Sequence, residues 1–162
     1  MKIIAYNGSP HSNGHCGKLI KAMLKGAESK GAETKKIDLI KEDIQHCNGC
    51  FKCATKDPEL KIGKCTIDDG MADLLQEWED ADGYILASPV YDMGITSIMK
   101  KFVERRIALT YRPKDAHVTL PDARNPYDFK RKAALVVTGF CGDELVEVMG
   151  EPCFVAMDAH LI

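Results

Sequence analysis

The stretch "NGSPHSNGHCGKLIK", residues 7–21, decides the fold class of this 162-residue chain. The apolar run before it, "IIAY" at residues 3–6, is typical of a strand buried on both faces. After it, apolar residues at helical spacing predict a helix over residues 17–31, and Gly31 ends that pattern. A short buried strand that leads through a polar loop into a helix indicates a parallel α/β sheet.

The rest of the chain repeats this alternation. The further predicted strands are 33–40, 83–91 and 132–140, and the further predicted helices are 68–81 and 96–109. Residues 33–40 are the most polar of these strands, so we expect them nearer an edge of the sheet. Residues 110–131 are polar and contain prolines, which predicts a long loop. We expect residues 144–162 to hold a short helix and a fifth strand.

Composition and charge narrow the class of protein. The hydrophobic fraction is 45%, which suits one domain with a real core over residues 1–162. The 22 basic and 24 acidic side chains are mixed along the chain and give a net charge of −2, so we expect no nucleic-acid or membrane partner. No apolar run approaches the roughly 18–20 residues that span a bilayer, and the N-terminal apolar stretch is too short for a signal peptide. We therefore expect a cytoplasmic protein.

The loop at residues 7–16 has the composition of a phosphate-binding site. Glycine lets the backbone approach an anion closely, and short hydroxyl and amide side chains add hydrogen-bond donors. Free N–H groups and the dipole at the start of the following helix also favour negative charge. The spacing matches neither the Walker pattern nor G-x-G-x-x-G. The alternative is an ordinary turn in which Ser or Asn caps the helix.

Two further strand ends carry small or polar residues. They are "ASPVYDMGIT" at residues 87–96 and "TGFCGD" at residues 138–143. Because ligands of open parallel sheets bind at the carboxyl ends of the strands, we expect these three loops to line one ligand site. The alternatives are that Tyr91 only covers the core and that residues 138–142 form a plain turn.

Three stretches together resemble the NADPH-dependent FMN reductase-like flavoproteins. They are "NGSPHSNGHCGKL", "CNGCFKC…GKCTIDDGM" and "SPVYDMGITSIMKKFVER", which occur in that family's order, and "RKAALVVTGF" matches the following strand more loosely. The resemblance implies a flavodoxin-like fold, with a doubly wound parallel sheet of five strands in the order 2-1-3-4-5. The C-terminal element of this sheet is expected to be short or incomplete. The resemblance also implies FMN as the cofactor.

The resemblance assigns the first loop to the FMN phosphate and the other two loops to the flavin ring. The implied binding positions are Ser9, His11, Asn13, Gly14, His15, Cys16, Pro89, Val90, Tyr91, Asp92, Met93, Gly94, Thr138 and Gly139. His11 stands where the family usually has Arg, His15 where it has Asn, and Cys16 where it has Thr or Ser. Asp92 stands where an aromatic is frequent. A neutral His is not reliably cationic and a thiol is a weak donor, so either FMN binds more weakly here or the backbone does most of the binding.

Four of the seven cysteines lie in the cysteine-rich loop at residues 45–65. Cys47, Cys50 and Cys53 are spaced C-x2-C-x2-C, and Cys65 follows after eleven residues. Spacing alone leaves open a 4Fe–4S cluster, a zinc ion and a set of reduced thiols. The iron–sulfur flavoprotein branch of the family has a similar motif, which implies a 4Fe–4S cluster on these four residues. Cys141 and Cys153 are expected in the core.

The leading hypothesis is an FMN-dependent oxidoreductase. NAD(P)H or a ferredoxin-like partner would supply electrons, and a small acceptor or a redox partner would receive them. A non-enzymatic flavin electron carrier of the flavodoxin type is the alternative. A zinc-stabilised binding module would leave residues 88–91 unexplained. A phosphatase or arsenate reductase needs the pattern C-x5-R, but the residue six positions after Cys16 is Ala22 and not an arginine.

Partners are expected on two grounds. The resemblance implies a homo-oligomer, either a dimer or a tetramer. Lysines surround the cysteines, and they would offset a negative cluster or attract an acidic partner, unless they only form a solvated surface. They are Lys52, Lys56, Lys61 and Lys64. No residue is assigned as a catalytic acid or base.

Overall fold

The structure is a computed structural model that describes residues 1–112, 122–124, 131–140 and 143–158. Its centre is a parallel sheet built from the long strands β1 (Lys2–Asn7), β2 (Glu33–Asp38), β3 (Gly83–Tyr91) and β7 (Lys132–Thr138). They lie in the order β2-β1-β3-β7, so β2 is at the edge, as its polar composition predicts. The parallel α/β fold is therefore confirmed, and this order agrees with the first four positions of the predicted one.

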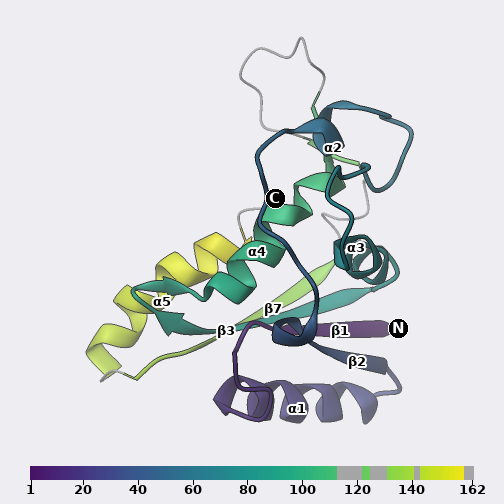
Figure 1. Ribbon diagram of the computed structural model, residues 1–162. Coiled ribbons are helices and arrows are strands. Elements are labelled where there is room, and N and C mark those ends of the chain that lie inside the picture. The colour runs from purple at the N-terminus through teal and green to yellow at the C-terminus, as the bar shows by residue number, and fades with distance from the viewer. Residues whose placement is uncertain (113–121, 125–130, 141–142, 159–162) are drawn as a thin grey trace.

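Helices cover both faces of the sheet (Figure 1). Helix α1 (His15–Glu28) packs on one face, below the sheet in Figure 1. On the other face lie α3 (Met71–Glu79), α4 (Ser97–Arg105) and α5 (Asp143–Asp158). Strands covered in this way are apolar on both sides, which explains the near-continuous apolar runs in the sequence.

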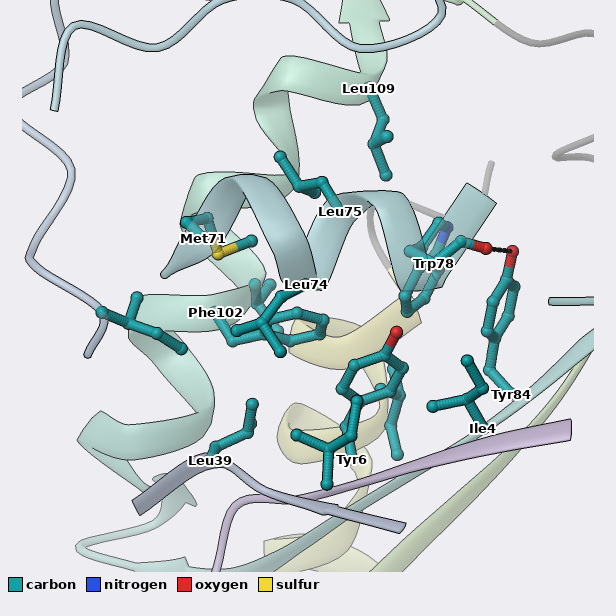
Figure 2. Packing of buried hydrophobic residues seen from close by; sticks show 14 of the residues in the cluster. Ile4, Tyr6, Leu39, Met71, Leu74, Leu75, Trp78, Tyr84, Phe102 and Leu109 are labelled. Atoms are coloured by element: carbon teal, nitrogen blue, oxygen red, sulfur yellow. Dashed lines mark hydrogen bonds between the residues drawn. The ribbon is translucent and has the colours of Figure 1, made fainter. Parts of the chain in front are cut away.

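The face toward α3 and α4 has an aromatic core, which Figure 2 shows. Side chains alternate along β1, so Tyr6 enters this core while Ala5 packs under α1. The rings of Tyr6 and Phe102 stack with 4.6 Å between centroids, and those of Trp78 and Tyr84 with 3.7 Å. The Tyr84 hydroxyl donates to the Trp78 carbonyl at 3.1 Å. These contacts fix α3 and α4 on the sheet and thereby position the segments at their ends.

The C-terminal segment differs from the prediction. Residues Asp143–Asp158 form one helix, so the fifth strand expected there is wrong within the described part of the chain. The apolar run after Pro152 looks like a strand, and proline ordinarily ends a helix. The helix nevertheless continues, and Cys153 and Met157, one turn apart, are fully buried, which offsets the hydrogen bond that Pro152 cannot donate. Cys153 is thus a core residue as expected, whereas Cys141 lies outside the described residues.

Short elements complete the fold. Strand β4 (Gly94–Ile95) pairs antiparallel with the end of β3, and the turn between them, Asp92 and Met93, has positive φ at both residues as in a type I′ turn. The others are η1 (Leu39–Lys41), α2 (Lys52–Thr55), η2 (Arg106–Leu109), β5 (Thr110–Tyr111) and β6 (Asp122–Ala123). β5 and β6 pair with each other inside the predicted loop at 110–131. No helix in the described ranges is long and apolar enough to cross a membrane.

Candidate functional site

The first loop leaves the start of α1 open to an anion. Gly14 is the N-cap residue, and no side chain of the described residues caps the helix there. The first N–H groups of a helix have no partner within it, so those of α1 remain available. The side chains of His11, Asn13 and His15 are exposed around this point. Ser9 is buried, and its hydroxyl accepts a hydrogen bond from the His11 N–H at 3.1 Å. The loop therefore has the arrangement of an anion-binding helix start.

Polar residues of β1 and β2 hold this loop in shape, and the sequence analysis missed them. Asn7 and Asp38 are register partners, and the Asn7 amide donates to the Asp38 carboxylate at 2.8 Å. Lys36 pairs with Asp38 at 2.8 Å and donates to the Ser12 carbonyl at 2.7 Å. Burial raises the pKa of Asp38, but the hydrogen bonds that it accepts, that of Lys36 first, outweigh burial and hold the pKa below its usual value. The unusual polarity of the second strand is the signal that could have indicated these residues.

The first and second loops are joined where their strands end. The Gly8 N–H donates to the Ala87 carbonyl at 2.7 Å, and the Thr96 hydroxyl donates to the Gly8 carbonyl at 2.6 Å. The Thr96 hydroxyl also caps α4 by accepting from the Met99 N–H at 3.1 Å. The second loop therefore starts and ends beside the first loop, as expected of strands that share one edge.

Thr138 brings the third loop next to the first turn of α1. Its hydroxyl lies 3.2 Å from the Sγ of Cys16, in the first turn of α1. Burial raises the pKa of Cys16, which is only 2% exposed, so its side chain is packed inside rather than open to a ligand. Cys16 can therefore offer an anion its backbone N–H but not its side chain.

Exposed apolar side chains border the joined loops. Tyr91 and Met93 are about half exposed, and Phe140 is fully exposed. The other predicted positions divide into the partly buried Pro89, Val90 and Gly94 and the exposed Asp92 and Gly139. This edge of the sheet thus combines an anion-binding loop, which suits a phosphate group, with an apolar border, which suits an aromatic ring.

The four predicted cysteines line one cavity of about 350 Å³. Cys47, Cys50 and Cys53 come from the segment around α2, which lies beyond the end of α4 in Figure 1. Gly63 lets the returning chain lie against this segment, because a side-chain carbon on Gly63 would stand 1.8 Å from the Cys53 carbonyl oxygen. That close approach brings Cys65 to the same cavity.

Backbone N–H groups point at the cysteine sulfurs. The Gly49 N–H lies 3.4 Å from the Sγ of Cys47, and the Ile67 N–H lies 3.5 Å from the Sγ of Cys65. In both pairs the donor follows the cysteine by two residues. Hydrogen bonds of this kind stabilise a thiolate over a thiol and tune the potential of a metal centre that the thiolate binds.

The electrostatic surroundings differ between the cysteines of the cavity. A hydrogen bond from the Lys52 N–H lowers the pKa of Cys50, whereas burial, and then the charges of the three other cysteines, raises the pKa of Cys53. Within the described ranges, no three His, Cys, Asp or Glu side chains stand close enough to hold one metal ion. A zinc ion needs four sulfurs about 2.3 Å from one point, whereas an Fe–S cluster binds each thiolate through a different iron. Either group would draw on the four cysteines that line this cavity.

A buried ion pair stands behind Cys65. Arg105 donates two hydrogen bonds to Asp69, at 2.7 and 3.0 Å, and neither side chain is more than 2% exposed. Arg105 also donates to the Gln45 carbonyl at 2.9 Å and lies 3.5 Å from the Sγ of Cys65. Burial raises the pKa of Asp69, but hydrogen bonds, that of Arg105 first, outweigh burial and keep the pKa below its usual value. Both residues lie in stretches that carry the family resemblance, yet nothing in their spacing indicates that they pair.

Arg124 clamps the cysteine segment from a distant part of the chain. Its guanidinium uses five N–H donors on backbone carbonyls, which is the full capacity of an arginine. The acceptors are the carbonyls of Cys53, Lys56, Asp57, Leu60 and Thr110, at 2.7 to 3.1 Å. No local signal in the sequence predicts this role, because the acceptors are carbonyls, which every residue has.

The chain is similar to known flavoproteins. The sequence pattern of the NADPH-dependent FMN reductase family matches residues 1–152. An iron–sulfur flavoprotein of Archaeoglobus fulgidus is 36% identical over 113 residues, which are 70% of this chain and 49% of that protein. An iron–sulfur flavoprotein of Methanosarcina thermophila is 33% identical over 109 residues, which are 67% of this chain and 54% of that protein. The chain thus spans about half the length of these curated relatives.

The fold is also found among solved structures. An NAD(P)H:quinone oxidoreductase from Methanothermobacter marburgensis superposes with a TM-score of 0.63 at 14% identity, over 97% of this chain and 75% of that one. This likeness shows a shared fold. Together with the match over residues 1–152 and the relatives above 30% identity, it leads to one conclusion: the chain belongs to the NADPH-dependent FMN reductase family.

Proposed function

We propose that the chain acts as an FMN-dependent oxidoreductase of the iron–sulfur flavoprotein type. Electrons would come from NAD(P)H or from a ferredoxin-like protein and leave to a small acceptor or a redox partner. The observation that carries this proposal is the meeting of three loops at one sheet edge, where the uncapped start of α1 lies beside an apolar border. The names of the family and of the relatives support it.

The residues of the chain would bind and orient the flavin. FMN, when bound, supplies the redox chemistry, because it exchanges electrons singly or in pairs. The N–H groups at the start of α1 would hold the phosphate. Tyr91 and Met93 would border the ring, and the exposed carboxylate of Asp92 would disfavour negative charge on it. We assign no side chain as an acid or base, since electron transfer through a flavin does not require one.

We further propose that the four cysteines of the cavity, Cys47, Cys50, Cys53 and Cys65, hold a 4Fe–4S cluster. Their shared cavity and the N–H groups aimed at sulfur support this, as do the names of the curated relatives. Exposed lysines accompany the cysteines along the sequence, and positive charge there would attract an acidic, ferredoxin-like partner. They are Lys52, Lys56, Lys61 and Lys64.

Anaerobic purification followed by absorption spectroscopy and iron analysis tests both proposals. We expect flavin absorption and a broad iron–sulfur shoulder that dithionite bleaches. Iron should be lost in Cys50→Ser but kept in the control Cys153→Ser, because Cys153 is buried and does not line the cavity. Flavin without iron would overturn the cluster proposal alone. A colourless protein that takes up no added FMN would overturn the flavin proposal.

Reduction of the bound flavin by NAD(P)H separates an enzyme from an electron carrier. Rapid bleaching of the flavin band by NADH or NADPH, with turnover on a quinone, is the expected result for an enzyme. Bleaching only by a reduced ferredoxin or by dithionite would favour the flavodoxin-type carrier instead.

A further inference from the structure

The phosphate loop has no cation of its own. Residues 7–17 include no lysine or arginine, and their only titratable cations are His11 and His15. A phosphate monoester carries about −1.5 to −2 charges at pH 7, so a site that selects it gains from nearby positive charge. On α1 itself the next cation is Lys18, which is exposed to solvent, so a less screened charge would have to come from a neighbouring element.

Lys36, on the neighbouring strand β2, brings an ammonium group to this loop. Its Nζ donates to the Ser12 carbonyl at 2.7 Å, in the middle of the loop. A side-chain carbon built on Gly17 would stand 3.5 Å from the same Nζ, which places the ammonium beside the first turn of α1. The side chain is only 24% exposed, so solvent screens its charge less than that of a surface lysine.

The groups around Lys36 leave a net positive charge. Asp38 forms ion pairs with Lys36 at 2.8 Å and with the more exposed Lys41 at 3.5 Å. Two ammonium groups and one carboxylate sum to one positive charge beside the loop. Removal of Lys36 would leave the carboxylate of Asp38 to oppose a bound anion, with Lys41 alone to balance it.

We propose that Lys36 is a binding residue for the flavin phosphate. Its ammonium group fixes the Ser12 carbonyl and supplies the positive charge that the loop lacks. The inference rests on the proposed flavin function and deepens it, because it makes the site selective for a phosphorylated flavin over riboflavin. A Lys36 that only supported the fold would affect both flavins, since both have the same ring, and one that only fixed the loop would weaken FMN binding equally at low and at high salt. A residue that acts by charge affects FMN alone.

Titration of the flavin-free protein with FMN and with riboflavin, followed by quenching of flavin fluorescence, tests this inference. Lys36→Met should weaken FMN binding about tenfold, the effect of one partly screened charge a few ångströms away, and should change riboflavin binding less than about twofold. Lys36→Arg should restore most of the loss. Added salt should weaken FMN binding more in the wild type than in Lys36→Met.

Lys35→Met is the matched control. Lys35 lies next to Lys36 on β2, and its ammonium pairs with Glu77 of α3 at 2.7 Å, so the net charge changes equally but away from the loop. This variant should bind FMN like the wild type. Circular dichroism would check folding, and Lys36→Gln replaces the methionine variant if that one does not fold.

Two results would overturn the inference while the flavin function stands. They are unchanged FMN affinity in Lys36→Met, and equal losses for FMN and riboflavin. A wild-type protein that binds neither flavin would instead reject the proposed function, and the role of Lys36 with it.

Discussion

Gly17 decides whether the phosphate loop can close over the start of α1. A side-chain carbon at this position would stand 2.0 Å from the Ser12 carbonyl oxygen, a distance that no packing tolerates. The same carbonyl accepts the hydrogen bond of Lys36, so the loop and the lysine share one fixed point. The single hydrogen atom of glycine is thus a condition for the geometry of the site.

Gly17→Ala and Gly26→Ala form a matched pair on the same helix. We expect Gly17→Ala to lower stability by about 1–3 kcal/mol and to weaken FMN binding at least about tenfold, because the loop must move outward. Gly26 has open space around it, so Gly26→Ala should raise stability by about 0.5–1 kcal/mol through helix propensity and leave FMN binding unchanged. Urea unfolding and FMN titration measure both effects. Equal behaviour of the two variants would contradict the argument.

Among elements, α4 connects the two candidate sites. Its N-cap, Thr96, is bonded to Gly8 of the phosphate loop, and its last residue, Arg105, lines the cysteine cavity. A nine-residue helix is about 13 Å long, so the ends of one rigid element set the separation of the two sites. The ion pair of Arg105 with Asp69 fixes the cysteine end of this helix.

Asp69→Asn should therefore destabilise the fold at neutral pH. It leaves the buried charge of Arg105 without a carboxylate, which costs about 3 kcal/mol or more. Because the folded pKa of Asp69 lies below its unfolded value of about 4, the wild type holds this stability above pH 4 and loses it as the pH falls through the folded pKa. The difference between wild type and variant should thus be constant from pH 7 to about pH 4 and narrow below that.

Urea unfolding across this pH range measures the difference, and Asp68→Asn is the control. Asp68 is the exposed neighbour of Asp69, so its substitution should change stability by less than about 0.5 kcal/mol. A variant at Asp69 that is as mild as the control would show that the ion pair does not hold the cysteine end of α4.

Elements were predictable from the sequence where burial dictates their pattern. β1 and β3 are apolar on both faces because helices cover both, and this produces the continuous runs that predict them. β7 is only partly buried, but its apolar residues also pack toward both faces. The sequence predicts a short helix within residues 144–162, but not its continuation to Asp158. Pro152 and the β-branched Val155 disfavour helix locally, and the burial of Cys153 and Met157 overrides this preference.

At the scale of the whole molecule, the sequence predicts which loops form the candidate sites. It does not predict the hydrogen bonds and ion pairs that hold these loops in place. Parallel strands bring their carboxyl ends to one edge, so loops far apart in the chain had to meet there. The residues that hold the loops in place, Lys36, Asp38, Arg105 and Arg124, come from other elements, and their contacts depend on strand register and on backbone carbonyls. The polarity of the second strand hints at Lys36 and Asp38, but the contacts of Arg105 and Arg124 have no sequence signature.

The outer surface of the molecule bears on the expected homo-oligomer. Helix α5 exposes Val148 and Val155, seven residues apart on one side, at 60% and 61%, and the neighbouring Phe154 is also exposed. Exposed apolar surface of this kind is typical of a protein–protein interface. We therefore expect a dimer or a larger assembly that buries this face of α5.

Val155→Lys should shift that assembly toward the monomer. A charge placed in an apolar contact must be desolvated, so the dissociation constant should rise at least about tenfold. Leu19→Lys is the matched control, since Leu19 is an exposed apolar residue on α1, on the opposite face of the sheet. Light scattering during gel filtration measures the molar mass. A monomeric wild type, or dissociation by Leu19→Lys alone, would show that the exposed face of α5 does not join copies of this chain.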